Sequence, residues 1–165
     1  MAESLLYTKF ETPITFGDSG QSYPIALQNL AANAGVYSNR ADRGAGSIAT
    51  RYIVRARFRK GVASVVNEVI GVYIFTSDGT DSDGTLATTG TTLTTAMLPN
   101  AWDSFGVVVE STSTAVSFIR SRIVEIPTRY FTVGVMNSLT GLLTNTANTA
   151  LISFTPIVDA LQAQA

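Results

Sequence analysis

The sequence predicts an all-β fold, an antiparallel β-sandwich of jelly-roll type with one short helix or helical turn at most. Three observations support this fold class. The chain is rich in Thr, Ser, Val, Ile, Tyr and Phe, which favour strands over helices. Several short apolar runs end in residues typical of turns. The 165 residues suffice to bury a full core without disulfides, so we expect a single domain over residues 1–165.

Two long segments predict the central strands. Residues 51–60 alternate with period two, which places two sets of side chains on opposite faces: Tyr52, Val54, Ala56 and Phe58 on one, and Arg51, Ile53, Arg55, Arg57 and Arg59 on the other. Residues 68–77 are apolar almost throughout, as expected of a strand covered on both faces.

Shorter apolar runs predict the remaining strands, at residues 14–16, 24–27, 105–110, 115–119, 130–136 and 150–154. Residues 111–114 have the length of a hairpin loop, and residues 137–141 predict another turn. Residues 26–34 predict a short helix or a loop, because Leu27 and Leu30 are three apart among alanines. Residues 77–100 predict a long connection between the sheets, with 91–95 as an edge strand.

The two ends of the chain, residues 1–12 and 156–165, are candidate interaction arms that become ordered against a neighbouring subunit. Fraying in solution is the alternative. Residues 1–10 lack a basic segment followed by a long apolar run, so we expect no signal peptide. No apolar stretch approaches the roughly 18 residues of a membrane span, so we expect a soluble protein made in the cytoplasm.

The composition excludes most familiar catalytic groups. Without His or Cys the chain has no Ser-His-Asp or Cys-His centre, no thiolate or imidazole zinc site and no dithiol redox pair. Carboxylate chemistry would depend on Glu68, Glu110 or Glu125, and no spacing places two of them on one cleft wall. A Ser-Lys pair could use only Lys9 or Lys60. We therefore expect no enzyme and no cofactor.

The charge balance argues against nucleic acid as a partner. The chain has 11 Lys and Arg against 12 Asp and Glu, a net charge of −1. Binding to phosphates strengthens with the number of cations that displace counterions, and no global excess of cations is present.

An acidic loop is a weak calcium candidate. Asp78, Asp81 and Asp83 lie among glycines, but the loop departs from the EF-hand pattern because Gly79 occupies the first ligand position and no acid follows at the twelfth. A solvated turn explains the same residues.

The arginine-rich face of the strand over residues 51–60 is a candidate interface. Arg51, Arg55, Arg57 and Arg59 place four guanidinium groups on one side. Such a face suits carboxylates of a neighbouring subunit. The alternatives are nucleic acid, which usually requires interleaved aromatic residues, and a solvated face whose charge prevents aggregation.

Trp102 is the only tryptophan and a candidate platform for a sugar ring in a carbohydrate-binding sandwich. Core or rim packing is the alternative for this side chain.

The order of several segments resembles that of small virion structural proteins of tailed bacteriophages. The segments are residues 24–31 leading to Ser38 and Asp42, the long strand that follows, residues 72–79, and residues 126–130 followed by 133–137. The resemblance spans nearly the whole chain, and the family has no catalytic signature to transfer.

The resemblance implies a non-enzymatic β-sandwich that binds a phage head or tail through subunit contacts. We expect a capsid decoration or cement protein, located in the virion, that forms homo-oligomers and binds the major capsid protein or other virion proteins. No membrane and no nucleic acid are expected as partners. A tail or neck protein and a carbohydrate-binding sandwich for host attachment are the alternatives. Few charges and a positive mean hydropathy agree with a subunit that buries much of its surface.

Overall fold

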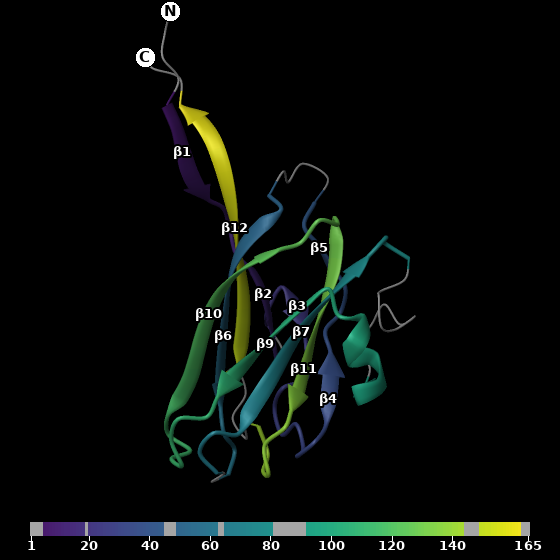
Figure 1. Cartoon of the computed structure of the whole chain (residues 1–165), viewed down its shortest axis with the longest axis vertical. Helices are drawn as coiled ribbons and strands as arrows, with labels where there is room; N and C mark the ends of the chain where they lie inside the picture. Colours follow the sequence, from purple (N-terminus) through teal and green to yellow (C-terminus); the bar gives the residue numbers. More distant parts are fainter. Residues whose placement is uncertain are drawn as a thin grey trace, which may run out of the picture.

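The computed structural model describes residues 5–18, 20–44, 49–62, 65–80, 92–143 and 149–162. The described residues lie mostly in strands, with little helix. Within the described residues, the strands form two six-stranded sheets that pack against each other (Figure 1). The predicted all-β sandwich is confirmed. Its jelly-roll-like character stays a prediction.

The strands are, in chain order, β1 (Leu5–Phe10), β2 (Ile14–Gly17), β3 (Tyr23–Pro24), β4 (Gly35–Tyr37), β5 (Ala41–Asp42), β6 (Arg51–Arg59), β7 (Val69–Ser77), β8 (Thr92–Leu93), β9 (Asp103–Val108), β10 (Ser117–Glu125), β11 (Tyr130–Asn137) and β12 (Leu151–Gln162). One 3-10 helix, η1 (Thr95–Asn100), follows β8. Sheet 1 has the order β10-β6-β12-β2-β3, with β1 also on β12. Sheet 2 has the order β8-β4-β11-β7-β9, with β5 also on β11. All pairs are antiparallel except β2 with β3.

Strand β6 shows the predicted alternation. Its inner side chains, Tyr52, Val54, Ala56 and Phe58, are all 0% exposed. The arginines of the same strand alternate with them and are exposed or half-buried. Because successive side chains in a strand point to opposite faces, burial of the apolar set turns the arginines outward.

Four aromatic rings join the two sheets in the centre of the core. Phe154 of β12 lies 5.1 Å from Phe131 of β11 and 5.3 Å from Phe16 of β2, measured between ring centroids. Tyr52 of β6 packs against both Phe131 and Phe154 at 6.2 Å. These tilted and edge-on contacts add to the stabilisation that burial of the rings provides.

A smaller core covers the outer face of sheet 2. Tyr37, Phe75, Leu93 and Met136 form a buried cluster against which residues of η1 pack. The rings of Tyr37 and Phe75 meet edge to face at 4.9 Å. Strand β7 is therefore buried on both faces over most of its length, as its nearly continuous apolar sequence predicts.

The two ends of the chain pair with each other. Strand β12 pairs with β6 and β2 through its first half, and its second half pairs with β1 from Phe10↔Ile157 to Leu5↔Gln162. This two-stranded ribbon extends away from the sandwich (Figure 1). The described parts of the candidate arms, β1 and the second half of β12, thus pair with each other. Their ordering against a neighbouring subunit stays a prediction.

Residues 26–34 do not form the predicted short helix. Asn29 and Asn33 have positive φ values of 57° and 55°, which a right-handed helix does not allow. The Asp18 carboxylate accepts hydrogen bonds from the backbone N–H groups of Leu27 and Gln28, both at 3.0 Å. These contacts stabilise the alternative that the sequence left open, a loop.

Asn137 holds this loop against the turn that begins at its own position. Its buried side-chain amide donates to the carbonyl oxygens of Leu30, Ala31 and Gly141 at 2.9–3.0 Å. Its Oδ1 accepts from the N–H of Leu139 at 3.1 Å. The predicted turn at 137–141 is therefore confirmed as an Asx turn.

Two predicted connections are wrong. Residues 111–114 do not close a hairpin, because β9 pairs with β7 in sheet 2 whereas β10 pairs with β6 in sheet 1. Residues 77–100 do not connect the sheets, since β7 and β9 are neighbours in sheet 2. The intervening segment instead supplies β8 and the covering helix η1. Loop length alone does not determine which sheet the next strand joins.

Replacing Phe131 by Ala tests the aromatic centre of the core. The ring is fully buried between the sheets, so its loss should lower the free energy of unfolding by about 3–5 kcal/mol. Urea unfolding followed by tryptophan fluorescence measures the change. Ile123→Ala is the control, because this residue is 56% exposed and its truncation should change stability by less than about 0.5 kcal/mol. Equal losses in the two variants would contradict the assignment of the core.

Replacing Tyr37 by Phe tests the smaller core. The Tyr37 hydroxyl is buried without a hydrogen-bond partner in the described part of the chain, and burial raises the pKa of Tyr37 to about 12. Removing the hydroxyl should leave stability unchanged or raise it by up to about 1 kcal/mol. The same urea measurement applies. A loss above about 1 kcal/mol would show that the hydroxyl has a stabilising partner.

Candidate interaction surface

The outer face of sheet 1, here called the arginine face, combines guanidinium groups with aliphatic side chains. Strand register places four rows of residues across β10, β6 and β12 on this face: Ile119, Arg57 and Leu151; Ser121, Arg55 and Ser153; Ile123, Ile53 and Thr155; and Glu125, Arg51 and Ile157. Each row crosses all three strands. Arginines occupy three of the four central positions, and aliphatic residues lie in the first, third and fourth rows.

No described element covers the arginine face, whereas η1 lies over sheet 2 on the opposite side of the sandwich (Figure 1). Ile119 and Ile123 are 49% and 56% exposed. Single exposed aliphatic residues are common, but these two lie on the same face of β10. Ile119 is paired with Arg57, and Ile123 is paired with Ile53, which lies between Arg51 and Arg55 on β6. The combination is typical of a protein interface, in which arginine is enriched.

Arg51, Arg55, Arg57 and Arg59 of β6, here called the arginine stripe, are not equivalent. The Arg59 Nε donates to the carbonyl oxygen of Thr114 at 2.6 Å, in the loop between β9 and β10. The two ion pairs among the described residues join Arg122 to Asp103 and Arg129 to Asp42, so neither uses the stripe. Arg51 and Arg55 are exposed. The predicted clustering of the stripe on one face is therefore observed, and its role as an interface stays a prediction.

A hollow of about 180 Å³ lies over the first two rows of the arginine face. Its lining residues are Arg55 and Arg57 of β6, Ile119 of β10, and Leu151 and Ser153 of β12. Two guanidinium groups and one hydroxyl thus share a shallow site with two aliphatic walls. A site of this composition can hold an anionic oxygen group beside an apolar one.

The arginine face continues into the ribbon. Ile157, in the last row, pairs with Phe10 of β1, whose ring is 57% exposed. Paired residues of antiparallel strands lie on the same side, so Phe10 extends the face beyond the sandwich.

The edge strand of sheet 1, β10, carries charged side chains on the side opposite to the arginine face. Arg122 of β10 forms an ion pair with Asp103 of β9 at 3.1 Å and donates to the carbonyl oxygen of Ser104 at 2.6 Å. Arg120 lies two residues before Arg122 on the same side of β10. Inward-pointing charges on an edge strand oppose pairing with another sheet.

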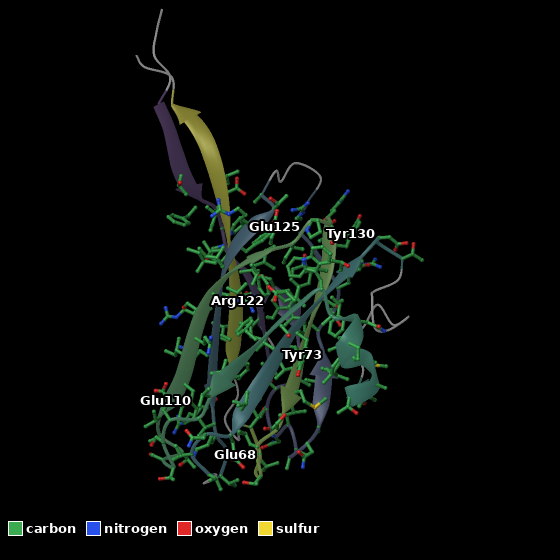
Figure 2. The ribbon with its side chains drawn as sticks, in the orientation of Figure 1. Glu68, Tyr73, Glu110, Arg122, Glu125 and Tyr130 are labelled. Carbon is green, nitrogen blue, oxygen red and sulfur yellow. The ribbon has the colours of Figure 1, made fainter. Side chains whose placement is uncertain are left out.

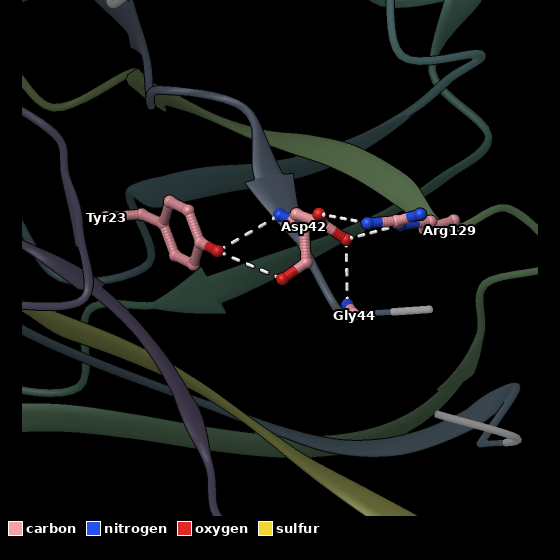
Figure 3. A network of polar contacts seen from close by, with 4 residues as sticks. All are labelled: Tyr23, Asp42, Gly44 and Arg129. Atoms are coloured by element: carbon pink, nitrogen blue, oxygen red, sulfur yellow. Dashed lines mark hydrogen bonds and ion pairs between the residues drawn. The ribbon is translucent and has the colours of Figure 1, made fainter. Parts of the chain in front are cut away.

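A second polar site lies near the end of the sandwich at β5. The Arg129 guanidinium binds the Asp42 carboxylate through two hydrogen bonds, at 2.8 and 2.7 Å (Figure 3). Gly44 donates its backbone N–H to the same carboxylate. The Tyr23 hydroxyl donates to the Asp42 carbonyl and accepts from its N–H, both at 3.0 Å. The hydrogen bond from Arg129 lowers the pKa of Asp42 from 3.8 to about 2.

The ring of Tyr130 extends this network to a second arginine. The Arg129 and Arg40 guanidiniums lie 4.9 and 5.2 Å from the centroid of the ring. Sequence spacing could not reveal the pair, since Asp42 and Arg129 are 87 residues apart. The pairing of β5 with β11 brings them together, because Tyr130 is opposite Asp42.

The calcium candidates are described only in part. The Asp78 carboxylate accepts the backbone N–H of Thr80 at 2.7 Å, as in an Asx turn. Asp81 and Asp83 lie outside the described residues. Over the described ranges, no three His, Cys, Asp or Glu residues gather as a metal site would require.

The three glutamates considered for catalysis do not form one site. Glu68 and Glu110 lie near one end of the sandwich and Glu125 near the other (Figure 2). Both Glu68 carboxylate oxygens accept backbone N–H groups, from Thr140 at 2.9 Å and from Val65 at 3.1 Å. Glu68 therefore stabilises neighbouring loops.

The remaining candidates have structural contacts. The Trp102 ring is 55% exposed, and its Nε1 donates to the carbonyl oxygen of Glu125 at 2.8 Å. The Lys60 ammonium is buried, donates to the Ser111 carbonyl at 2.7 Å and lies 5.8 Å from the centroid of the Phe118 ring. The side chain of Lys9 is not described.

Comparison with models of known protein families and with curated protein sequences gives no match. In the described part of the chain, no helix has the length and apolar character needed to cross a membrane.

The Asp42–Arg129 pair predicts a pH-dependent contribution to stability. The pKa of Asp42 in the folded protein, about 2, is below its ordinary value of 3.8. The stabilisation from the ionised carboxylate is therefore fully present above the unfolded pKa and is lost as the pH falls through about 2. Asp42→Asn should therefore unfold at lower urea than the wild type at pH 7, and this gap should close toward pH 2.

The double variant Asp42→Asn with Arg129→Gln completes the cycle. Once Asp42 is replaced, the effect of replacing Arg129 should be the same at both pH values, because no carboxylate remains to titrate. A gap between the wild type and Asp42→Asn that stays constant with pH would contradict the assigned pair.

Proposed function

We propose that this protein is a non-enzymatic structural component of a bacteriophage virion, a capsid decoration protein that stabilises the assembled shell through subunit contacts. The arginine face is the observation that carries the proposal. It is a whole sheet face without a covering layer in the described structure, and it combines exposed Ile119 and Ile123 with outward arginines. The segment order that resembles small virion proteins supplies the viral context.

The ribbon supports the same proposal. A two-stranded ribbon has little stability in water by itself, and the pairing of β1 with the end of β12 leaves both outer edges of the ribbon open within the described residues. Open strand edges can pair with another chain. A neighbouring subunit would therefore stabilise the ribbon as well as cover the arginine face.

The mechanism would be one of mass action. A protein that binds the assembled shell more tightly than its separate subunits shifts the assembly equilibrium toward the shell. The contribution of each contact can be small, because a decorated shell repeats it many times. The major capsid protein is the proposed partner, and contacts between copies of this chain are part of the proposal.

Quantitative peptide mass spectrometry of purified phage particles tests the proposal. We expect a copy number equal to that of the major shell subunit, or a simple fraction of it, because decoration follows the symmetry of the shell. A handful of copies per particle would overturn the decoration role and support a tail or neck protein. Absence of the protein from particles would overturn the virion assignment.

A further inference from the structure

We propose that the hollow between Arg55 and Leu151 binds a carboxylate that is carried next to an aliphatic side chain on an acidic segment of a partner protein. This inference rests on the proposed function, because it names the chemistry of the partner that would cover the arginine face. It adds a specific subsite, formed by five residues of three strands.

The polar groups of the hollow suit a carboxylate. Arg55 and Arg57 are two residues apart on β6, so both side chains leave the same face about 6.7 Å apart along the strand. Ser153 lies opposite Arg55 in the strand register and adds a hydroxyl. Guanidinium groups form bidentate, charge-assisted hydrogen bonds with carboxylates, and these are stronger than neutral ones.

The apolar groups of the hollow select what accompanies the carboxylate. Ile119 and Leu151 lie on either side of Arg57 in the register of β10, β6 and β12. Their side chains provide aliphatic walls within reach of the guanidiniums. An aliphatic side chain seated there would exclude water from the ion pair and strengthen it.

The charge of the whole face points to an acidic partner. Four arginines face outward from β6, and Glu125, opposite Arg51, is the only acidic residue in the four rows. The molecule as a whole has a net charge of −1, so this positive charge is local. Two copies that met through the same face would place arginines against arginines, which disfavours a symmetric dimer there.

The side chains between the arginines favour a protein segment over nucleic acid. None of the twelve residues in the four rows is aromatic, so the sandwich part of the face has no ring on which a base could stack. Aliphatic and hydroxyl side chains occupy these positions instead. An extended segment that carries acidic and aliphatic residues would match the arginines and the aliphatic residues of this face.

The test is a titration followed by NMR on the full chain, with N-acetyl-L-leucine as the probe. This molecule carries one carboxylate beside one branched aliphatic side chain. N-acetyl-L-leucinamide is the matched control, because it keeps the same aliphatic side chain and replaces the carboxylate by an uncharged carboxamide of similar size. We expect saturable, salt-sensitive shifts of the side-chain signals of Arg55, Arg57, Ile119, Leu151 and Ser153 with the acid, and much smaller shifts with the amide.

Two charge reversals locate the site. Arg55→Glu should weaken binding of the acid by about tenfold or more, because it removes a charge-assisted hydrogen bond and adds repulsion. Arg120→Glu changes the net charge equally but lies on the opposite side of β10, so it should bind like the wild type. Arg55→Gln, which removes the charge without adding a negative one, should give an intermediate loss and serves if Arg55→Glu does not fold.

Three outcomes would overturn the inference: equal shifts with the acid and the amide, shifts located away from the hollow, or equal losses in Arg55→Glu and Arg120→Glu. Preferential binding of a short oligothymidylate to the same residues would overturn the choice of a protein partner. The copy number in particles tests the proposed function separately. A protein present in particles whose hollow does not bind the acid would overturn this inference alone.

Discussion

The inward packing of one side of β6 is the constraint on which the rest of the structure depends. Tyr52, Val54, Ala56 and Phe58 are completely buried, and Tyr52 contacts rings of both β11 and β12. A shift of β6 by one residue would exchange its two faces and bury the arginines, at a cost far above the stability of a domain of this size. Burial of one side of β6 therefore turns the arginines of the other side toward solvent, whether or not the arginines make contacts of their own.

The local sequence pattern predicted a strand correctly where its hydrophobic pattern is strong and continuous. It did not predict which strands pair when the partners are distant in the sequence. The alternation over residues 51–60 and the apolar run over 68–77 predicted β6 and β7 almost to their ends. The apolar run at 150–154 predicted only the first part of β12, which continues to Gln162. Pro156 lies where the pairing of β12 passes from β2 to β1. That change of partner has no local signal.

The same limit applies to the functional surface. The arginine stripe could be predicted because all its members belong to one strand. The hollow could not, since Ile119 and Leu151 reach Arg57 only through the pairing of β6 with both β10 and β12. The ion pair of Asp42 with Arg129 likewise depends on the pairing of β5 with β11. Residues on different strands become a site only when the sheet order is known.

The choice of cation supports the proposal that another molecule covers the arginine face. All four cations that face outward from β6 are arginines, and the aliphatic residues Ile53, Ile119 and Leu151 lie among or beside them. Lysine would serve solubility equally well, but its ammonium is strongly hydrated and costly to cover. The guanidinium is more weakly hydrated and binds carboxylates in two places at once. Sheet 2 completes its outer face with η1, a segment of its own chain. The outer face of sheet 1 has no such covering among the described residues, and its arginines and aliphatic residues suit contact with another molecule.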